Sequence, residues 1–278
     1  GIANYYMIPY NEKIWAYPLE QMETQWMQGK MPLPTKKEMI RSVLLKDPKE
    51  RKMPHSSFYY PIDGGIQSMV DAIAAGLHIE YDFKIENIEK VNNKWNINGE
   101  GAFDYVISTI PLPVLPKVMN LPEQVVHHIQ DLKYNSLTTV LFDCPKTDIT
   151  WLYIPSHDYR SHRVGYQSAL TPHALPNPNR GCGALEIIGK QFNVDASFAD
   201  NKNILPEELG FEKVLDSEFT EFAYVIHDLN YRKNVTSIKD YFAEDSSFQL
   251  LGRWGTWNYK NMDLCMWDAM NLVKEILG

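Results

Sequence analysis

The sequence contains few cysteines, no surplus of basic residues and no long hydrophobic run, and each absence excludes a class of protein. Three cysteines occur in 278 residues, and none has the Cys-x-x-Cys spacing of a zinc or redox motif. Such widely spaced cysteines give no disulfide framework, so a reducing, cytoplasmic location is expected. A formal net charge of −8 argues against binding to nucleic acid or to an anionic membrane. No apolar run approaches the roughly 18 residues of a membrane-spanning helix.

The start of the chain lacks the signals of a targeting segment. It has no initiator methionine, no basic segment and no apolar segment of the kind found in signal peptides. The composition, with 44% hydrophobic and 22% charged residues, is typical of a globular protein. We therefore expect a globular chain that is part of a longer protein.

The histidines and serines do not indicate a metal site or a hydrolase. No carboxylate or cysteine stands at ligand spacing from four candidate histidines, His127, His128, His157 and His162. We interpret these histidines as surface or loop residues. Ser136 and Ser168 lack the strand-turn-helix context of a nucleophile elbow. The sequence therefore predicts no metal site and no hydrolytic nucleophile.

The first 57 residues carry interrupted helical patterns. Met22, Trp26 and Met27 stand at helical spacing, and a glycine and two prolines then act as a stop signal. Thr35 precedes Glu38 by three residues, which predicts a capping box at the start of a second helix. This part of the chain is predicted to be helical.

A mixed pattern follows from residue 58 onward. The Gly64-Gly65 turn leads into a predicted helix with apolar residues on one side, namely Ile66, Met69, Val70, Ile73 and Leu77. Short strand-like segments come next at 84–91 and 94–99. The run 104–111 predicts a buried strand that ends in a loop.

Residues 134–230 have the pattern of an antiparallel sheet. Proline- and asparagine-rich loops separate five strand-like runs, at 136–144, 151–156, 163–170, 184–190 and 221–231. One helical stretch is expected at 205–215. A single antiparallel sheet inserted between two other parts is the simplest architecture.

The segment LLGRWGTWNYKNMD, at 250–263, crowds glycines, an arginine and aromatic residues in front of the last helix. That helix carries an apolar stripe, which we predict to face the core: Met262, Met266, Met270, Val273 and Leu277. One interpretation of the segment is a turn that bears Arg253 and is packed by Trp254 and Trp257 for stability alone. The other interpretation depends on a family resemblance.

Four stretches together resemble a known group of flavoproteins. They are PYNEKIWAYPLEQMETQWMQGKMPLP, FYYPIDGGIQSMVDAIAAGL, FDYVISTIPLPVL and LLGRWGTWNYKNMD, in that order. The group is the flavin-dependent superfamily of amine oxidases and protoporphyrinogen oxidases, and the closer resemblance is to UDP-galactopyranose mutases of the longer, eukaryotic kind. WLYIPS, HRVGYQSAL and GRWGTWNY resemble substrate-domain and flavin-proximal motifs of that branch. The resemblance covers nearly all of the chain.

This resemblance implies an α+β fold that contains part of an α/β FAD-binding domain. The expected parts are a helical segment at 1–57, a partial FAD-binding domain with a β-meander at 58–112 and 251–278, and an antiparallel-sheet substrate domain at 113–250. The family's opening βαβ unit, whose GxGxxG loop holds the FAD pyrophosphate at a helix N-terminus, is not found in this sequence. The chain therefore resembles the distal two-thirds of a flavoprotein.

FAD is the cofactor that the resemblance implies, in its reduced form for mutase activity. The flavin N5 atom carries the chemistry in this family, so no catalytic residue of the protein is expected. The flavin-binding residues implied by the motifs are Gly252, Arg253, Gly255, Asn261, Met262 and Asp263. Glycines let the backbone approach a flat ring, and helix N–H groups favour the negative charge of a reduced flavin.

A nucleotide sugar is the substrate that the resemblance implies. Arg163 would contact its diphosphate, and Tyr153 and Tyr259 would donate phenolic hydrogen bonds to the phosphates. Tyr153 is explained equally well as a strand aromatic in the sheet core.

One position departs from the family pattern. Where the family has a second substrate arginine, this chain has Tyr59 or Tyr60, and Tyr59 takes that place in the predicted substrate site. The loss of one arginine–phosphate contact would cost roughly 1.5–3 kcal/mol unless a nearby cation such as Lys13 compensates.

Three functions remain open. The first is an FAD-dependent UDP-galactopyranose mutase-like enzyme that interconverts UDP-galactopyranose and UDP-galactofuranose for surface polysaccharide synthesis. The second is an FAD-dependent oxidoreductase of the amine oxidase or protoporphyrinogen oxidase type, which the missing arginine favours. The third is a non-catalytic remnant that binds a sugar nucleotide or a partner. Binding of UDP would separate the first from the second, and the sequence does not determine the oligomeric state.

Overall fold

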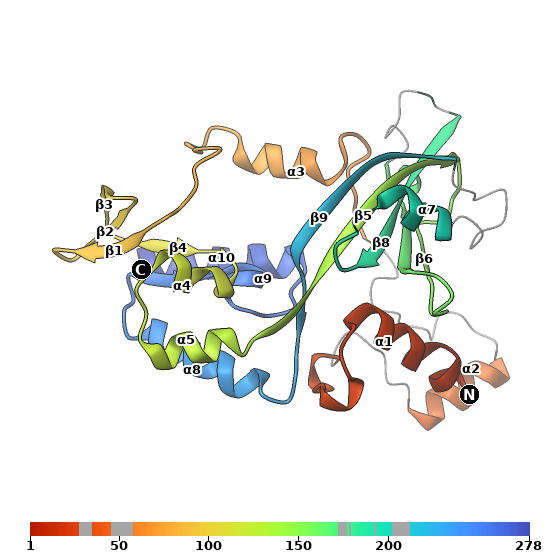
Figure 1. Cartoon of the computed structure of the whole chain (residues 1–278), viewed down its shortest axis with the longest axis horizontal. Helices are drawn as coiled ribbons and strands as arrows, with labels where there is room; N and C mark the ends of the chain where they lie inside the picture. Colours follow the sequence, from red (N-terminus) through yellow and green to blue (C-terminus); the bar gives the residue numbers. More distant parts are fainter. Residues whose placement is uncertain (28–34, 46–57, 172–176, 178, 192, 202–211) are drawn as a thin grey trace.

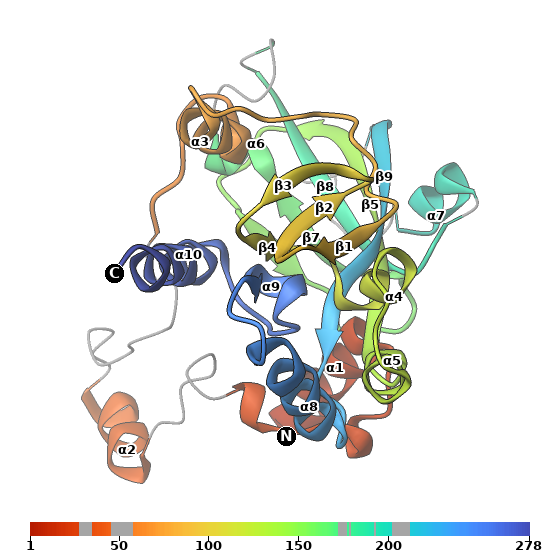
Figure 2. The same ribbon diagram turned by 90° about the vertical axis from the view of Figure 1, so that its left-hand side faces the viewer.

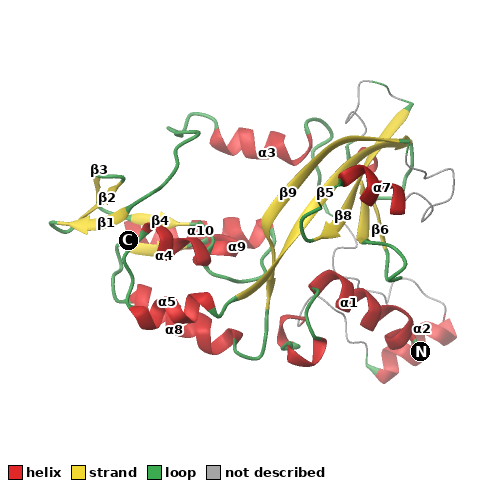
Figure 3. Ribbon diagram, in the orientation of Figure 1, coloured by secondary structure: helices red, strands yellow, loops and turns green. Residues whose placement is uncertain are grey.

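The computed structural model of the chain describes residues 1–27, 35–45, 58–171, 177, 179–191, 193–201 and 212–278. Two parts of the molecule lie side by side and are joined by two long strands, β5 (Lys133–Pro145) and β9 (Lys213–Ile226) (Figure 1). Both strands connect a layer of helices to an antiparallel sheet, and they run in opposite directions (Figure 3). The mixed helix and sheet content confirms the expected α+β class.

The sheet has five strands in the order β6-β7-β8-β5-β9, and every neighbouring pair is antiparallel. Its remaining strands are β6 (Trp151–Tyr153), β7 (Ser161–Tyr166) and β8 (Arg180–Ile188). Side chains alternate between the two faces of a strand, and one face is apolar. That face is covered by α7 (Val194–Asn201), whose Phe198 packs against Phe142 at 6.1 Å between ring centroids. The prediction of one antiparallel sheet is confirmed.

The prediction of a helix at 205–215 is wrong for residues 212–215, the part of this stretch that the structure describes. Residues 213–215 form the start of β9, with Lys213 paired with Asp143 of β5. The backbone of β5 needs hydrogen-bond partners along its whole length, and this need overrides the local helical propensity. Residues 202–211 lie outside the described part of the chain.

A second core forms around the parallel pair β4 (Val106–Ser108) and β10 (Phe248–Leu250). The surrounding helices are η5 (Leu112–Val114), α4 (Leu115–Val118), α5 (Glu123–Gln130), α8 (Tyr231–Ala243) and α9 (Gly252–Gly255). Leu115, Ile129, Ile238 and Trp257 are among its most buried residues.

These contacts bear on the predicted boundaries at residues 113 and 250. The segments 115–132 and 231–250 pack in one core with β4 and Trp257. The cause is the parallel β4–β10 pair, because parallel strands need apolar cover from helices. The division into functional domains itself stays a prediction.

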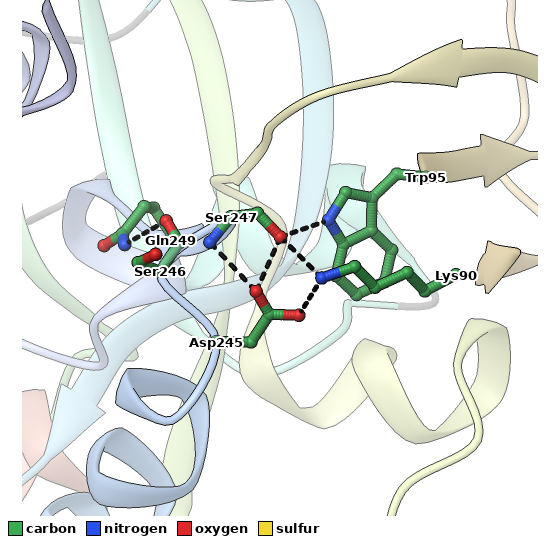
Figure 4. Close-up of polar contacts among 6 residues, drawn as sticks. All are labelled: Lys90, Trp95, Asp245, Ser246, Ser247 and Gln249. Atoms are coloured by element: carbon green, nitrogen blue, oxygen red, sulfur yellow. Dashed lines mark hydrogen bonds and ion pairs between the residues drawn. The ribbon is translucent and has the colours of Figure 1, made fainter. Parts of the chain in front are cut away.

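The β-meander expected in this part is present as β1 (Ile88–Val91), β2 (Lys94–Ile97) and β3 (Glu100–Phe103). It projects from one end of the molecule (Figure 1), which faces the viewer in the second view (Figure 2). Trp95 anchors it, since its indole N–H donates to Ser247 Oγ at 2.9 Å (Figure 4). The Trp95 ring also packs on Phe248. Lys90 adds an ion pair of 2.6 Å with Asp245 (Figure 4).

The N-terminal part is helical but more broken than expected. It contains η1 (Ala3–Met7), α1 (Ile8–Trp15), η2 (Leu19–Gln21), η3 (Gln25–Met27) and α2 (Lys36–Leu45). The capping box before α2 is confirmed, because Thr35 N–H donates to Glu38 and Glu38 N–H donates back to Thr35 Oγ1. A helix through Met22 is wrong, since Met22 is extended and bridges to Asp228. Residues 28–34 lie outside the described part of the chain.

The helix α3 (Gly65–Ala74) and the last helix α10 (Met262–Leu277) occur as predicted, but the predicted packing of α10 is wrong. The five residues of its apolar stripe are between 37% and 80% exposed, and no residue of α10 is buried. The stripe is amphipathic, but no described element of the chain covers it. The sequence pattern therefore identified the helix and not its partner.

Candidate functional site

Tyr153 and Arg163 stand opposite each other on neighbouring strands. Tyr153 of β6 pairs with Arg163 of β7, and Arg163 in turn pairs with Glu186 of β8. Directly opposed residues of antiparallel strands have their side chains on the same face. The three side chains therefore share the face of the sheet opposite to α7.

Glu186 is the centre of the polar contacts on this face. Its Oε1 accepts hydrogen bonds from Arg163 Nε at 3.0 Å and Arg163 Nη2 at 2.5 Å. Its Oε2 accepts a hydrogen bond from the Tyr224 hydroxyl at 3.0 Å and lies 3.3 Å from His162 Nε2. Burial raises the pKa of Glu186, but its contacts with His162 and Arg163 outweigh that effect and hold the pKa at about 2. The carboxylate is therefore ionised at neutral pH.

The interpretation of His162 as a surface or loop residue is wrong, because its side chain is fully buried in β7. The physical reason is a β-bulge. Ser161 pairs with Ile187 and Arg163 pairs with Glu186, which leaves His162 as an extra residue in β7. Burial lowers the pKa of His162, although the neighbouring Glu186 opposes that shift.

The other candidate histidines divide between surface and interior. His157 and His127 are exposed, as expected. His128 is buried between α5 and α8, where its Nδ1 lies 3.0 Å from Asn234 Oδ1. For His128 the surface interpretation is wrong, since the amphipathic α5 turns this residue towards α8.

Arg253 and Tyr259 reach the same region from the other side. The Arg253 guanidinium lies 4.3 Å from the Tyr259 ring centroid and 5.7 Å from that of Tyr224. Its Nη2 donates to the Ala223 carbonyl at 3.2 Å. Trp15 closes the cluster, with ring centroids 6.1 Å from both tyrosines. Tyr224 thus joins the predicted substrate residue Arg163 to the predicted flavin residue Arg253.

Helix α1 forms a wall of this cluster. The Tyr10 ring meets Tyr153 edge-on at 5.2 Å and lies 6.3 Å from His162. Burial raises the pKa of the Tyr10 hydroxyl, which keeps this group neutral. Lys13 donates to the carbonyls of Ile154 and Ser156, at 3.0 and 2.5 Å, and burial lowers its pKa to about 8. The Lys13 ammonium therefore fixes the segment that follows β6.

The two glycines of the Gly-Arg-x-Gly step meet backbone constraints within the chain. Gly252 has a φ of +76°, which favours glycine. A Cβ atom on Gly255 would lie 2.5 Å from the Ser108 carbonyl oxygen. The Leu251 N–H also donates to that oxygen at 2.9 Å. The glycines thus seat α9 on the carboxyl end of β4, and their approach to a flavin ring stays a prediction.

The remaining predicted flavin residues lie together at the start of α10. Asn261 is the residue before its first turn, Met262 begins the helix, and Asp263 places an acidic side chain in that turn. All three are exposed. Their role at a flavin stays a prediction.

Tyr59 does not join the buried cluster. Its side chain is fully exposed, whereas the neighbouring Phe58 stacks on Trp151 at 5.9 Å. The predicted substrate-binding role of Tyr59 therefore has no support from packing in this structure.

Sequence reasoning missed Glu186, Tyr224 and Tyr10 as site residues. One signal could have identified Glu186, because it is the sole charged residue in the apolar run at 181–189. A charge in a buried strand needs a partner, and Arg163 is that partner. Tyr224 and Tyr10 carried no comparable signal, since aromatic residues are common in strands and helices alike.

The described residues contain no group of three or more histidine, cysteine, aspartate or glutamate side chains arranged to hold a metal ion. No helix in the described part of the chain has both the length and the apolar character needed to cross a membrane.

Residues 36–153 match the family model described as flavin containing amine oxidoreductase. The crystal structure of a reduced UDP-galactopyranose mutase matches all of this chain with a TM-score of 0.80 and 20% identity, and the chain spans 65% of that protein.

Two further structures match less closely. A protein of Exiguobacterium sp. 255-15 assigned as a protoporphyrinogen oxidase has a TM-score of 0.54 and 16% identity, covering 68% of this chain and 46% of that one. The CLA-producing fatty acid isomerase of P. acnes has a TM-score of 0.58 and 12% identity, covering 76% and 52%. At these identities the matches show a shared fold.

Residues 36–153 therefore resemble the flavin-containing amine oxidoreductases. Over its whole length the chain shares its fold with the reduced UDP-galactopyranose mutase. The resemblance found from the sequence motifs is confirmed at this level.

Proposed function

We propose that the chain is the substrate-binding and flavin-facing portion of an FAD-dependent UDP-galactopyranose mutase-like enzyme. Such an enzyme would interconvert UDP-galactopyranose and UDP-galactofuranose for surface polysaccharide synthesis. The observation that carries the proposal is the convergence of Arg163, Tyr153, Tyr259 and Arg253, predicted from separate motifs, on one cluster around Tyr224.

The charge of the cluster suits a diphosphate. Arg163, Arg253 and Lys13 supply three cationic groups, and Glu186 supplies the facing carboxylate, in a chain whose formal net charge is −8. A local excess of positive charge in an acidic protein requires an anionic ligand or a structural reason. Arginine forks and phenolic hydroxyls are also the donors best suited to phosphate oxygens.

The residues beside α9 fit a flavin. Ser108 Oγ, Arg253 Nε and Trp257 Nε1 are buried and have no hydrogen-bond partner among the residues that the structure describes. Buried polar groups normally have partners, so these atoms indicate a polar ligand next to the turn. Arg253 and the start of α10 would hold the flavin, which supplies the electron pair for the sugar chemistry when bound. The protein's own groups bind and orient the substrate.

The experiment that tests the proposal is a calorimetric titration of this chain with UDP. We expect saturable binding, and we expect Arg163→Met to weaken it by about tenfold or more, because a charged hydrogen bond contributes about 1.5–3 kcal/mol. Arg160→Met is the control, since Arg160 forms an exposed ion pair with Asp200 near the same strand. Absence of UDP binding, or equal binding by Arg163→Met, would contradict the proposal.

A titration with FAD tests the cofactor. Quenching of flavin fluorescence should saturate, and Arg253→Ala should weaken the binding. If Arg253→Ala leaves the quenching unchanged, Arg253 is not part of the flavin site.

A flavin oxidoreductase is the second candidate, and one observation favours it. The position at which the mutase motif has a second arginine carries Tyr59, whose side chain is exposed and uncharged. FAD binding without UDP binding would support this candidate. A chain that binds UDP but not FAD would support the third candidate, a non-catalytic binding protein.

A further inference from the structure

One carboxylate connects three strands of the sheet on the site face. Glu186 lies on β8, its partners His162 and Arg163 lie on β7, and its partner Tyr224 lies on β9. Three donor atoms, two of Arg163 and one of Tyr224, bond its two oxygens at 2.5 to 3.0 Å, and His162 Nε2 lies 3.3 Å away. Only 15% of the Glu186 side chain is exposed, so water competes weakly for these contacts.

The β-bulge explains how two consecutive residues reach the same carboxylate. In a regular strand, neighbouring side chains point to opposite faces, so His162 and Arg163 could not both approach Glu186. The bulge at His162 removes this restriction, and the ladder resumes at the Arg163–Glu186 pair. The backbone of β7 is therefore shaped to deliver both side chains to one point.

Tyr224 extends the network towards the other arginine. Its hydroxyl donates to Glu186 Oε2 at 3.0 Å, and its ring stacks on Tyr259 with centroids 6.3 Å apart. Arg253 lies over both rings. Glu186 therefore fixes the orientation of the Arg163 side chain through direct hydrogen bonds. It fixes the Tyr224–Tyr259–Arg253 stack indirectly, through the hydroxyl of Tyr224.

We infer that Glu186 is a positioning residue that holds Arg163 in the orientation for an anionic ligand and ties that arginine to the aromatic stack beneath Arg253. The inference rests on the proposed function for the identity of the ligand, a nucleoside diphosphate. Glu186 itself acts through its neighbours, because its negative charge would repel a phosphate at close range.

The charge and the geometry of Glu186 are both needed for this role. A glutamine at this position keeps the shape but carries no charge and offers a single acceptor oxygen, so its hydrogen bond to Arg163 is weaker than that of the carboxylate. Aspartate keeps the charge but shortens the reach by one methylene. Glutamine should therefore release Arg163 more completely than aspartate does.

The first readout concerns Arg163 alone and needs no ligand. In the ¹⁵N-labelled chain, the Nε–H signal of Arg163, assigned with Arg163→Lys, should exchange slowly with water because Glu186 holds it. Glu186→Gln should accelerate that exchange at least tenfold, and Glu186→Asp should do so less. Glu212→Gln is the matched control, since Glu212 pairs with a different arginine, Arg180 of β8, at a more exposed site, and should leave the Arg163 signal unchanged.

The second readout is the affinity for UDP, measured by calorimetry on the same proteins. Glu186→Gln should weaken UDP binding about tenfold, Glu186→Asp should recover part of the loss, and the affinity for FAD should change less than twofold. A purely structural role would lower the affinities for UDP and for FAD to a similar extent. Tyr224→Phe, which removes one hydroxyl, serves if Glu186→Gln does not fold, and it should weaken UDP binding two- to fourfold.

Two outcomes would overturn the inference. Unchanged exchange at Arg163 in folded Glu186→Gln would show that Glu186 does not hold the arginine. Unchanged UDP affinity in that variant, when the native chain binds UDP, would show that the contact does not serve the ligand. If the native chain fails to bind UDP while the exchange behaves as expected, the contact stands and the proposed sugar-nucleotide function falls.

Discussion

Trp257 and Trp267 stand ten positions apart, on either side of the start of α10, and they meet opposite surroundings. Trp257 is fully buried in the core around β4, whereas Trp267 is 58% exposed on α10. The same contrast separates the sheet, which has packed side chains on both faces, from α3 and α10, which contain no buried residue. Hydrophobic character alone therefore does not tell which residues stabilise this chain, because burial requires a partner surface.

The largest expected effect is on the buried tryptophan. Trp257→Ala should lower the free energy of unfolding by about 3–5 kcal/mol, because it removes a large side chain from a packed core. Trp267→Ala should change it by less than about 0.5 kcal/mol, as surface substitutions usually do. Urea unfolding of both variants measures the difference. Equal losses would mean that α10 packs against the rest of the chain more tightly than its exposure indicates.

The next effect concerns the buried carboxylate of the sheet. The pKa of Glu186 is about 2 in the folded chain, below the ordinary value of 4.5, so the ionised form stabilises the fold. This stabilisation, on the order of 3 kcal/mol, is fully present above about pH 4.5 and is lost as the pH falls towards 2. Glu186→Gln should flatten that part of the stability curve, measured by denaturant unfolding between pH 5 and pH 2. A curve of unchanged slope would show that other groups dominate the acid sensitivity.

A smaller effect is expected where α9 rests on β4. Gly255→Ala would bring a methyl group against the Ser108 carbonyl and should cost about 1–3 kcal/mol of unfolding free energy. Gly165→Ala is the control, because the nearest atom to its added Cβ is 3.9 Å away. If both variants unfold at the same denaturant concentration, the turn has room that the structure does not show.

The smallest effect is expected on the exposed stripe of α10. Met270→Gln should leave the unfolding free energy within about 0.5 kcal/mol of the native value, since Met270 is more than half exposed. It should also reduce binding of an apolar fluorescent dye, because the exposed apolar area shrinks. A loss of several kcal/mol would place the stripe in a packed core, as the sequence alone had predicted.

The parts of the fold that sequence could predict were those set by local periodicity. The strands of the sheet, α3, the capping box at Thr35 and the last helix all have patterns that one segment carries by itself. The prediction of a helix at 205–215 was wrong at Lys213, because Lys213 pairs with a residue of β5 that is distant in the sequence. The prediction that the apolar stripe of α10 faces the core was wrong for a related reason. The sequence pattern shows which face of the helix is apolar, but it does not show which other element packs against that face.

The candidate site shows the same limit. Arg163 and Tyr153 were identified through motifs, and their pairing across β6 and β7 places them together. The burial of His162 was not predicted, because the alternation of side chains between the two faces of a strand does not reveal a β-bulge. The bulge interrupts that alternation. Tyr224 comes from a strand more than sixty residues away from Arg163, so only the assembled sheet reveals their shared carboxylate.

The bulge at His162 also means that inserting or deleting one residue in β7 changes which side chains lie beside Glu186. Ser161 faces the core with Ile187 on one side of the bulge, and Val164 faces the same core on the other. Deleting His162 would restore a regular ladder and leave both neighbours on their present faces. Chains that share this sheet can therefore gain or lose a buried side chain beside Glu186 by a one-residue insertion or deletion, and an alignment of them should show a gap at this position rather than a substitution.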